Sequence, residues 1–218
     1  MKIRPFKLSD TPSVVKVYRD AVRRIGPIAY SPEQIAAWSR YPTDELDFGY
    51  RLTRGYTLVM EEDGTIYAFG QLHPRNCFAF LYTTGDTHKK GLGAQLYDAL
   101  ESHAFSAGVI DMHTEVSRIA RPFFEKRGFT LDEVVRTIHF GVEFEWYRLS
   151  RSREMARAYR QTLLPSASAQ EDHSRANDRL PAPAWVSAAR SRGILCNDAI
   201  EAAVAKEYHQ PGSVRRRR

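Results

Sequence analysis

Hydrophobic and polar positions along the first part of the chain predict a strand followed by helices. Residues 2–7 read as a strand, and residues 9–26 repeat apolar side chains at helical spacing. Ser31 and Gln34 flank a proline with the spacing of a capping box, which predicts the start of a second, short helix. The chain is therefore expected to begin with one strand and two helices.

The middle of the chain changes to strand periodicity and then alternates between strands and helices. Asp63 and Gly64 mark a hairpin turn between two β-rich runs, and residues 76–83 continue as a third strand. After a glycine-containing turn, leucines recur every four residues, as is typical of a helix with one buried face. The remaining segments predict, in order, a strand over residues 109–116, a helix over 117–128 and two strands over 129–150. The whole pattern indicates a mixed α/β domain.

Residues 151–218 differ from the rest in composition. Residues 1–150 contain 19 Lys and Arg against 19 Asp and Glu, so the later segment carries the entire formal net charge of +6. Its richness in Ser, Ala, Pro and charge predicts a basic extension that is largely disordered or partly helical. We therefore expect a folded domain over 1–150 and an extension over 151–218. The basic charge then describes the extension and does not indicate a nucleic-acid-binding domain.

Several classes of protein are disfavoured by composition. No apolar run reaches the roughly 20 residues of a membrane span. The N-terminus also lacks the apolar stretch of a secretory signal. Cys77 and Cys196 lie far apart and form neither a disulfide framework nor a metal-ligand cluster. These features predict a cytoplasmic protein that needs no metal and has no membrane partner.

The turn before the leucine-rich helix carries the strongest chemical signal. Its sequence, HKKGLG, runs from His88 to Gly93. Glycines let a phosphate approach the N–H groups of a helix N-terminus, and Lys89 and Lys90 add positive charge. The order of lysine and glycine does not fit a Walker A loop, and one Rossmann glycine is missing. The turn is therefore a candidate pyrophosphate site, although by itself it is equally typical of a solvated helix start.

The surroundings of this turn resemble the GNAT superfamily of N-acetyltransferases. LYTTGDTHKKGLGAQLYDALE, residues 81–101, is similar to the family's cofactor motif, and FFEKRGF, residues 123–129, is similar to its later motif. AYSPEQIAAW and VSRIARPFFEKRGF resemble the YafP-like bacterial branch. The resemblance implies a mixed α/β fold with a bifurcated central sheet, which binds acetyl-CoA between the fourth and fifth strands.

The same resemblance implies which residues hold acetyl-CoA. The backbone of the fourth strand would pair with the pantetheine arm, and N–H groups of the turn would bind the pyrophosphate. The implied cofactor-binding residues are Leu81, Tyr82, Thr83, His88, Lys89, Lys90, Gly91, Leu92, Gly93 and Ala94. His88 departs from the Gln or Arg that is usual at the first position of the loop.

For catalysis, the resemblance implies direct attack of an amine on the thioester. Protein groups would help to remove a proton, stabilise the oxyanion and protonate the thiolate. The family's thiolate-protonating tyrosine corresponds to Phe124, which has no proton to donate. Tyr82 and Tyr147 are candidate substitutes for this acid, and Glu115 is a candidate base. Each has a structural alternative, because tyrosines often pack in sheets and exposed carboxylates are usually solvated.

The sequence thus predicts an acetyl-CoA-dependent N-acetyltransferase that acts on a primary amine of a small molecule or peptide. The alternative is a non-catalytic acyl-CoA-binding or regulatory module, which Phe124 favours. An acidic cleft would indicate polyamines or aminoglycosides, a wide groove would indicate peptide N-termini, and no motif decides between them. We expect no nucleic-acid partner from the four terminal arginines, and a homodimer remains open.

Overall fold

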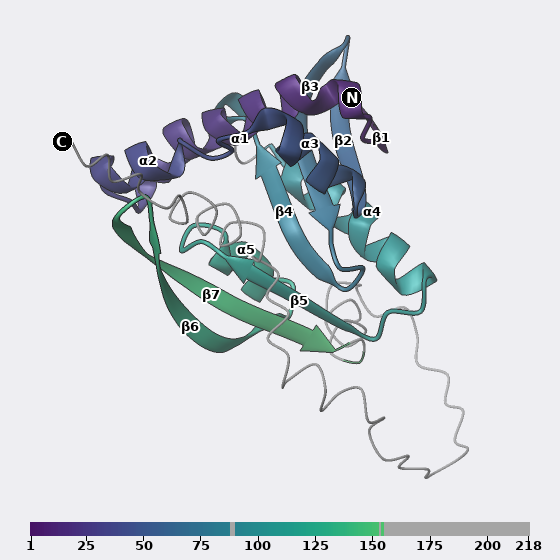
Figure 1. Cartoon of the computed structure of the whole chain (residues 1–218). Helices are drawn as coiled ribbons and strands as arrows, with labels where there is room; N and C mark the ends of the chain where they lie inside the picture. The colour runs from purple at the N-terminus through teal and green to yellow at the C-terminus, as the bar shows by residue number, and fades with distance from the viewer. Residues whose placement is uncertain (88–89, 153, 155–218) are drawn as a thin grey trace, which may run out of the picture.

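The computed structural model describes residues 1–87, 90–152 and 154. In this part of the chain, seven strands form one sheet in the order β1-β2-β3-β4-β5-β7-β6, with helices on both faces (Figure 1). The strands are β1 (Lys2–Pro5), β2 (Tyr56–Glu62), β3 (Thr65–Leu72), β4 (Cys77–Thr83), β5 (Asp111–Val116), β6 (Thr130–His139) and β7 (Val142–Ser152). The helices are α1 (Thr11–Ile25), α2 (Pro32–Trp38), α3 (Glu45–Thr53), α4 (Leu92–Ser106) and α5 (Arg121–Glu125).

The predicted order of elements is confirmed with one addition, the helix α3. Its N-cap is Asp44, whose carboxylate accepts a hydrogen bond of 3.0 Å from the backbone nitrogen of Asp47. Phe48 and Leu52, four residues apart, are its buried face. Gly49 weakens the helical signal, but a side chain there would collide with Thr11 on α1. Close packing of two helices thus explains a glycine that reads as a helix breaker.

Two hydrophobic cores lie on opposite faces of the sheet. Helices α1, α2 and α3 cover one face, where Tyr18 and Phe48 are almost fully buried. Helices α4 and α5 cover the other face, where Leu96 and Leu100 have no exposed surface. Burial of each large apolar side chain stabilises the fold by roughly 1.5–3 kcal/mol. The leucine repeat therefore performs the packing role that its spacing predicts.

The sheet opens between β4 and β5. These parallel strands are registered at only two pairs, Cys77 with His113 and Phe78 with Thr114. Beyond that point β4 continues alongside β3, while β5 continues alongside β7. The β5-facing edge of β4 therefore lacks a strand partner over 79–83 within the described sheet, so its backbone groups are available to another chain or ligand. Figure 1 shows the two strands diverging at this point.

The end of β7 lies close to the predicted domain boundary. This strand runs past residue 150 to Ser152, so the first residues of the predicted extension belong to the sheet. The rest of that extension, apart from residue 154, lies outside the described residues. None of the described helices combines the length and the apolar character that crossing a bilayer requires.

Candidate active site

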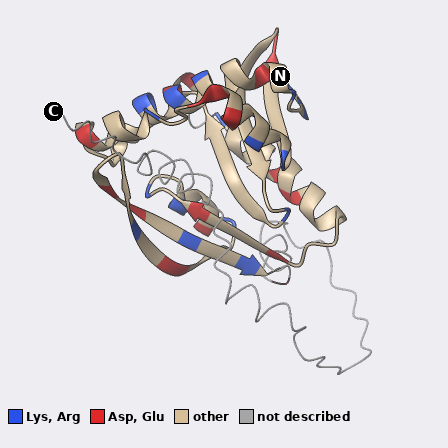
Figure 2. Cartoon of the chain, viewed as in Figure 1, with Lys and Arg blue, Asp and Glu red and all other residues tan. Residues whose placement is uncertain are grey.

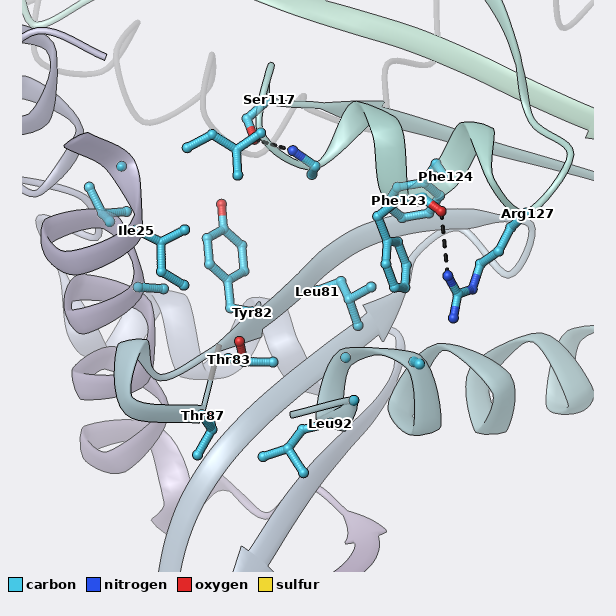
Figure 3. A pocket seen from close by; sticks show the side chains of 18 of the residues that line it. Ile25, Leu81, Tyr82, Thr83, Thr87, Leu92, Ser117, Phe123, Phe124 and Arg127 are labelled. Atoms are coloured by element: carbon cyan, nitrogen blue, oxygen red, sulfur yellow. Dashed lines mark hydrogen bonds between the residues drawn. The ribbon is translucent and has the colours of Figure 1, made fainter. Parts of the chain in front are cut away.

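A cavity of about 450 Å³ opens where β4 leaves β5. Its walls come from α1, β4, the N-terminus of α4 and the segment from β5 to α5 (Figure 3). The lining residues are Ala21, Val22, Ile25, Gly26, Trp38, Leu81, Tyr82, Thr83, Thr87, Gly91, Leu92, Gly93, Ala94, Ser117, Ile119, Ala120, Phe123, Phe124 and Arg127. The cavity therefore joins one end of α4 to the unpaired edge of β4.

Helix α4 begins directly after its N-cap residue Gly91, and its first turn has no side-chain cap. Gly91 has a φ of 82°, a left-handed conformation that disfavours side chains, and no side chain caps the helix there. The first N–H groups of a helix have no partner within the helix, and they lie at the positive end of its dipole. This turn therefore offers donors and partial positive charge to the cavity, as an anion site requires.

The space around Gly93 indicates whether the turn can accommodate a phosphate. A Cβ at Gly93 would lie 3.6 Å from Cγ2 of Thr83, which is an ordinary contact. Internal packing therefore does not require a glycine at this position. A ligand that approaches the backbone closely gives it a reason, since a bare backbone admits a phosphate where a side chain would not. The residues present fit the pyrophosphate of acetyl-CoA.

Most of the predicted cofactor residues meet in this cavity. Those that line it are Leu81, Tyr82, Thr83, Gly91, Leu92, Gly93 and Ala94. Lys90 is exposed beside the turn and does not line the cavity. His88 and Lys89 lie outside the described residues. The role of all ten in binding acetyl-CoA stays a prediction.

Arg127 is a cavity residue that sequence reasoning missed. Its guanidinium lies 3.7 Å from the ring centre of Phe123 and 4.7 Å from that of Tyr97 on α4. Within the described residues no carboxylate forms a salt bridge with it. The signal in the sequence was a basic residue just before Gly128, which was predicted to end a helix. Only the tertiary packing places that residue beside α4.

Tyr82 projects from β4 into the cavity (Figure 3). Its ring centre lies 4.6 Å from that of Tyr18, whose hydroxyl accepts a hydrogen bond of 2.7 Å from Nε1 of Trp38. Burial raises the pKa of the Tyr82 phenol well above its ordinary value of 10.0. The group therefore keeps its proton at neutral pH and combines packing with the capacity to donate a hydrogen bond.

Phe124 and Tyr147 occupy different surroundings. Phe124 lines the cavity but is only 2% exposed, and it packs edge-on against Phe78. Tyr147 is absent from the cavity lining. Its hydroxyl donates to Oε2 of Glu145 at 3.3 Å, and the guanidinium of Arg121 lies 4.9 Å from its ring centre. The structure thus places Tyr82, and not Tyr147, in the lining of the main cavity. The role of either tyrosine as an acid stays a prediction.

Glu115 belongs to a line of ion pairs across the sheet. Its carboxylate accepts a hydrogen bond of 2.9 Å from Nε of Arg148 on β7, and Nη1 of Arg148 donates to Glu133 on β6 at 2.7 Å. Opposite charges alternate along this outer ribbon, whereas β4 carries none (Figure 2). Glu115 also lines a smaller cavity of about 80 Å³ beside the diverging strands. This smaller cavity adjoins the main one, because Tyr82 and Ala120 line both. The candidate base therefore lies beside the main cavity and is engaged by a cation.

Other aromatic and histidine side chains near the site are mainly structural. Tyr30 and Phe48 lie in the core on the α1 face, whereas Trp38, in the same core, also reaches the cavity. His73 is exposed after β3. Among the described side chains, no group of three His, Cys, Asp or Glu residues is arranged to hold a metal ion.

The diverging parallel strands and the open helix N-terminus define an α/β protein with a cleft in its sheet. The model of the acetyltransferase (GNAT) family matches residues 24–129, which include β4, α4, β5 and α5. The domain that these residues form belongs to the GNAT superfamily of acetyltransferases. The predicted fold class and the predicted superfamily are confirmed.

Solved structures show the same fold. A GCN5-related N-acetyltransferase from Rhodopseudomonas palustris is 26% identical, with a TM-score of 0.66, over 69% of this chain and 94% of that one. The PaiA N-acetyltransferase of Thermoplasma acidophilum, solved with coenzyme A, is 18% identical, with a TM-score of 0.57, over 69% of this chain and 98% of that one. The ribosomal-protein-S18-alanine N-acetyltransferase of Escherichia coli is also 18% identical, with a TM-score of 0.53, over 69% of this chain and 92% of that one. A search of curated proteins gave no match.

Proposed function

We propose that this chain transfers the acetyl group of acetyl-CoA to a primary amine of a small molecule or peptide. The observation that carries the proposal is the cavity that joins the uncapped N-terminus of α4 to the unpaired edge of β4. A phosphate site and a free strand edge are the two features needed to hold a pyrophosphate and an amide-containing arm. The family match supports the class of reaction.

Acetyl-CoA would be held at two places. N–H groups at the start of α4 and the guanidinium of Arg127 would bind its phosphates, since charge-assisted hydrogen bonds are the strong ones. Backbone groups of Leu81, Tyr82 and Thr83 would pair with the pantetheine arm, as an added strand pairs with a sheet edge. When bound, acetyl-CoA supplies an acetyl group activated as a thioester.

The protein's own groups would assist the transfer from the cavity wall. Tyr82 keeps its proton and can donate a hydrogen bond to the departing sulfur, which Phe124 cannot do. The apolar walls favour the neutral form of an incoming amine, because burial disfavours an ammonium ion. General acid assistance contributes roughly 10²–10⁴-fold, and positioning of the two reactants contributes further.

We also propose the finer assignments that the sequence indicates. Phe124 and the segments AYSPEQIAAW and VSRIARPFFEKRGF support a place in the YafP-like branch. The composition of 151–218 supports an extension appended to a cytoplasmic acetyltransferase domain. Buried Phe124 also favours the second candidate function, a module that binds acyl-CoA without turnover.

The deciding experiment introduces a carboxylate into the phosphate turn. In Gly93→Asp the Cβ fits, but the new charge opposes the phosphates. We expect titration calorimetry to show at least a tenfold loss of acetyl-CoA affinity, about 1.4 kcal/mol. Gln95→Asp is the matched control, because that residue is exposed in the same turn and outside the cavity lining. Equal affinity in folded Gly93→Asp and wild type would contradict the site.

A second measurement separates the enzyme from the binding module. Release of the CoA thiol is followed with a panel of primary amines, with the wild-type full chain as catalyst. Amine-dependent release above the rate of hydrolysis supports the enzyme. Tight binding of acetyl-CoA without amine-dependent release, across the whole panel, would favour the module.

A further inference from the structure

The end of the cavity away from α4 has apolar walls. Ala21, Val22 and Ile25 face it from α1, and Ile119 and Ala120 face it from the segment before α5. Figure 3 shows Ile25 opposite Tyr82, at a distance from the helix start that would hold the phosphates. An acceptor that reaches the thioester from this end would therefore lie against aliphatic side chains.

The charge distribution distinguishes the two ends. Among the described lining residues, the charged one is Arg127, which stands with Phe123 at the cofactor end. No lining residue in the described part of the chain is Asp or Glu. Asp20, next to the cavity residue Ala21, already accepts hydrogen bonds from the nitrogen of Gly85 and pairs with Arg24. Glu115 lines the adjoining smaller cavity, but its carboxylate accepts a hydrogen bond of 2.9 Å from Arg148. Among the described residues, the nearby carboxylates are thus already engaged by other groups of the protein and are not placed to hold a second ammonium group.

This distribution disfavours polycations as acceptors. A polyamine or an aminoglycoside carries several ammonium groups, and burying an ammonium ion without a partner is costly. An amine on an alkyl or arylalkyl body gains from the same walls, because each methylene placed in an apolar pocket is worth about tenfold or more in specificity. Such walls also favour the neutral, nucleophilic amine, which reduces the need for a base such as Glu115.

We propose that the acceptor is a primary alkyl- or arylalkylamine whose apolar body packs against Val22, Ile25 and Ile119. The proposal rests on the proposed function, and it narrows the acceptor class that the sequence leaves open. Ile25 is the specificity residue easiest to change, since its side chain is only half-buried.

The test compares kcat/KM for propylamine, hexylamine, phenethylamine, spermidine, kanamycin and an alanine-initiated hexapeptide. We expect hexylamine and phenethylamine to exceed propylamine by at least tenfold, and the three polar acceptors to fall below propylamine. Ile25→Glu should lower the value for hexylamine at least tenfold and raise that for spermidine, with the KM for acetyl-CoA within twofold. Ile28→Glu is the control, because Ile28 is 66% exposed and outside the cavity lining. The kcat/KM values of this variant should rank the amines as wild type does.

The possible outcomes are separable. Turnover of spermidine, kanamycin or the peptide equal to that of hexylamine overturns the acceptor class but leaves the acetyltransferase standing. Binding of acetyl-CoA without turnover of any amine overturns both. If Ile25→Glu fails to fold, Ile25→Ala replaces it, and an unchanged ratio of hexylamine to propylamine in that variant contradicts the proposal.

Discussion

Asp20 on α1 accepts a hydrogen bond of 2.7 Å from the backbone nitrogen of Gly85, which begins the turn that leads to α4. Nε of Arg24 lies 3.0 Å from Oδ1 of Asp20, and the same guanidinium pairs with Asp86. A side chain at Gly85 has no room, because its Cβ would lie 2.6 Å from that of Arg24. The helix that forms the proposed acceptor wall is therefore fastened to the turn that precedes the proposed phosphate site.

Loss of the hydrogen bond between Asp20 and Gly85 should weaken the binding of acetyl-CoA, although Asp20 itself does not line the cavity. Asp20→Ala removes a hydrogen bond to a charged acceptor, which is worth roughly 1.5–3 kcal/mol. Without this hydrogen bond, the turn that precedes α4 should be held less firmly in the position that binds acetyl-CoA. We expect the Kd for acetyl-CoA to rise about fivefold to tenfold by titration calorimetry. Asp20→Asn keeps an acceptor oxygen and should lose less. Asp98→Ala, exposed on α4, is the control, and equal Kd values in all three variants would contradict the role of Asp20.

The two candidate tyrosines should behave differently in kinetics. Tyr82→Phe removes the phenol that projects into the cavity, so kcat should fall by roughly 10²-fold at unchanged acetyl-CoA affinity. Tyr147→Phe should leave kcat nearly unchanged, because its hydroxyl donates to Glu145 outside the cavity lining. Phe124→Tyr should leave the rate equal or higher, since it restores a donor. A loss of kcat in Tyr147→Phe alone would reverse this assignment.

The raised pKa of Tyr82 also predicts a pH profile. A phenol donates while it is protonated, and burial moves its pKa above 10.0. The contribution of Tyr82 to kcat should therefore persist as the pH rises through 10.0, and the ratio of wild type to Tyr82→Phe should stay constant up to that pH. A ratio that declines between pH 8 and 10 would show that the phenol ionises in its ordinary range.

A buried ion pair joins α4 to the end of β7. Glu101 accepts hydrogen bonds from Arg151 and, at 2.7 Å, from the hydroxyl of Tyr97. Arg151 also donates to the carbonyl oxygen of Arg127 at 2.5 Å. Glu101→Ala should lower the free energy of unfolding by about 3–5 kcal/mol, because it leaves a buried guanidinium without its carboxylate. Urea denaturation of the full chain measures this loss.

A surface pair provides the comparison for that prediction. Arg121 and Glu125 form an ion pair on α5 and are partly exposed, so Glu125→Ala should change stability by less than about 1 kcal/mol. The double variant Glu101→Leu with Arg151→Met should recover much of the loss, because no unpaired charge remains. Equal effects at positions 101 and 125 would show that the buried pair contributes no more than an exposed one.

His139 should make stability depend on pH below neutrality. It is 5% exposed, its Nε2 lies 2.8 Å from the hydroxyl of Thr137, and Nε1 of Trp146 donates to the same Nε2 at 3.3 Å. A tryptophan nitrogen can only donate, so Nε2 is an acceptor and the neutral ring is preferred. Burial lowers the pKa of His139 below 6.5. The unfolded chain therefore binds a proton more readily, and stability should fall as the pH drops below about 6.5.

Thermal unfolding at several pH values checks this prediction. The contribution of His139 should be complete above its unfolded pKa and should decline towards the lowered folded pKa. His139→Gln keeps an acceptor but does not titrate, so its Tm should fall less between pH 7.5 and 5. His113→Gln is the control on an exposed histidine of β5, and its Tm should follow that of wild type. Parallel curves for wild type and His139→Gln would contradict the prediction.

The local order of strands and helices could be predicted because hydrophobic periodicity and caps are local signals. The leucines of α4 and the Ser31–Gln34 capping box both lie where their spacing places them. Helix α3 was missed because Gly49 serves a helix–helix contact that no local rule reveals. Helix α5 is also shorter than the predicted helix over 117–128, since it runs only from Arg121 to Glu125.

The candidate site was predictable only where one segment forms it. Gly91 to Ala94 are adjacent in the sequence, so the sequence was sufficient to group them, and all four line the cavity. Arg127 and the wall of α1 reach the cavity through tertiary packing, and nothing in their spacing indicates it. Tyr82 and Tyr147 both read as strand tyrosines. Only the arrangement of β4 and β7 around the opening of the sheet distinguishes them.

The two-pair register between β4 and β5 would give the thioester arm of bound acetyl-CoA a mechanical role. The sheet consists of two halves joined at the pairs Cys77–His113 and Phe78–Thr114. An arm paired along β4 would therefore fill the gap between the diverging strands as an additional strand. Substrate would then be part of the domain's framework during each turnover. Acetyl-CoA at 100 times its Kd would add about 2.7 kcal/mol to the stability of the whole domain, and departure of CoA would loosen the two halves together.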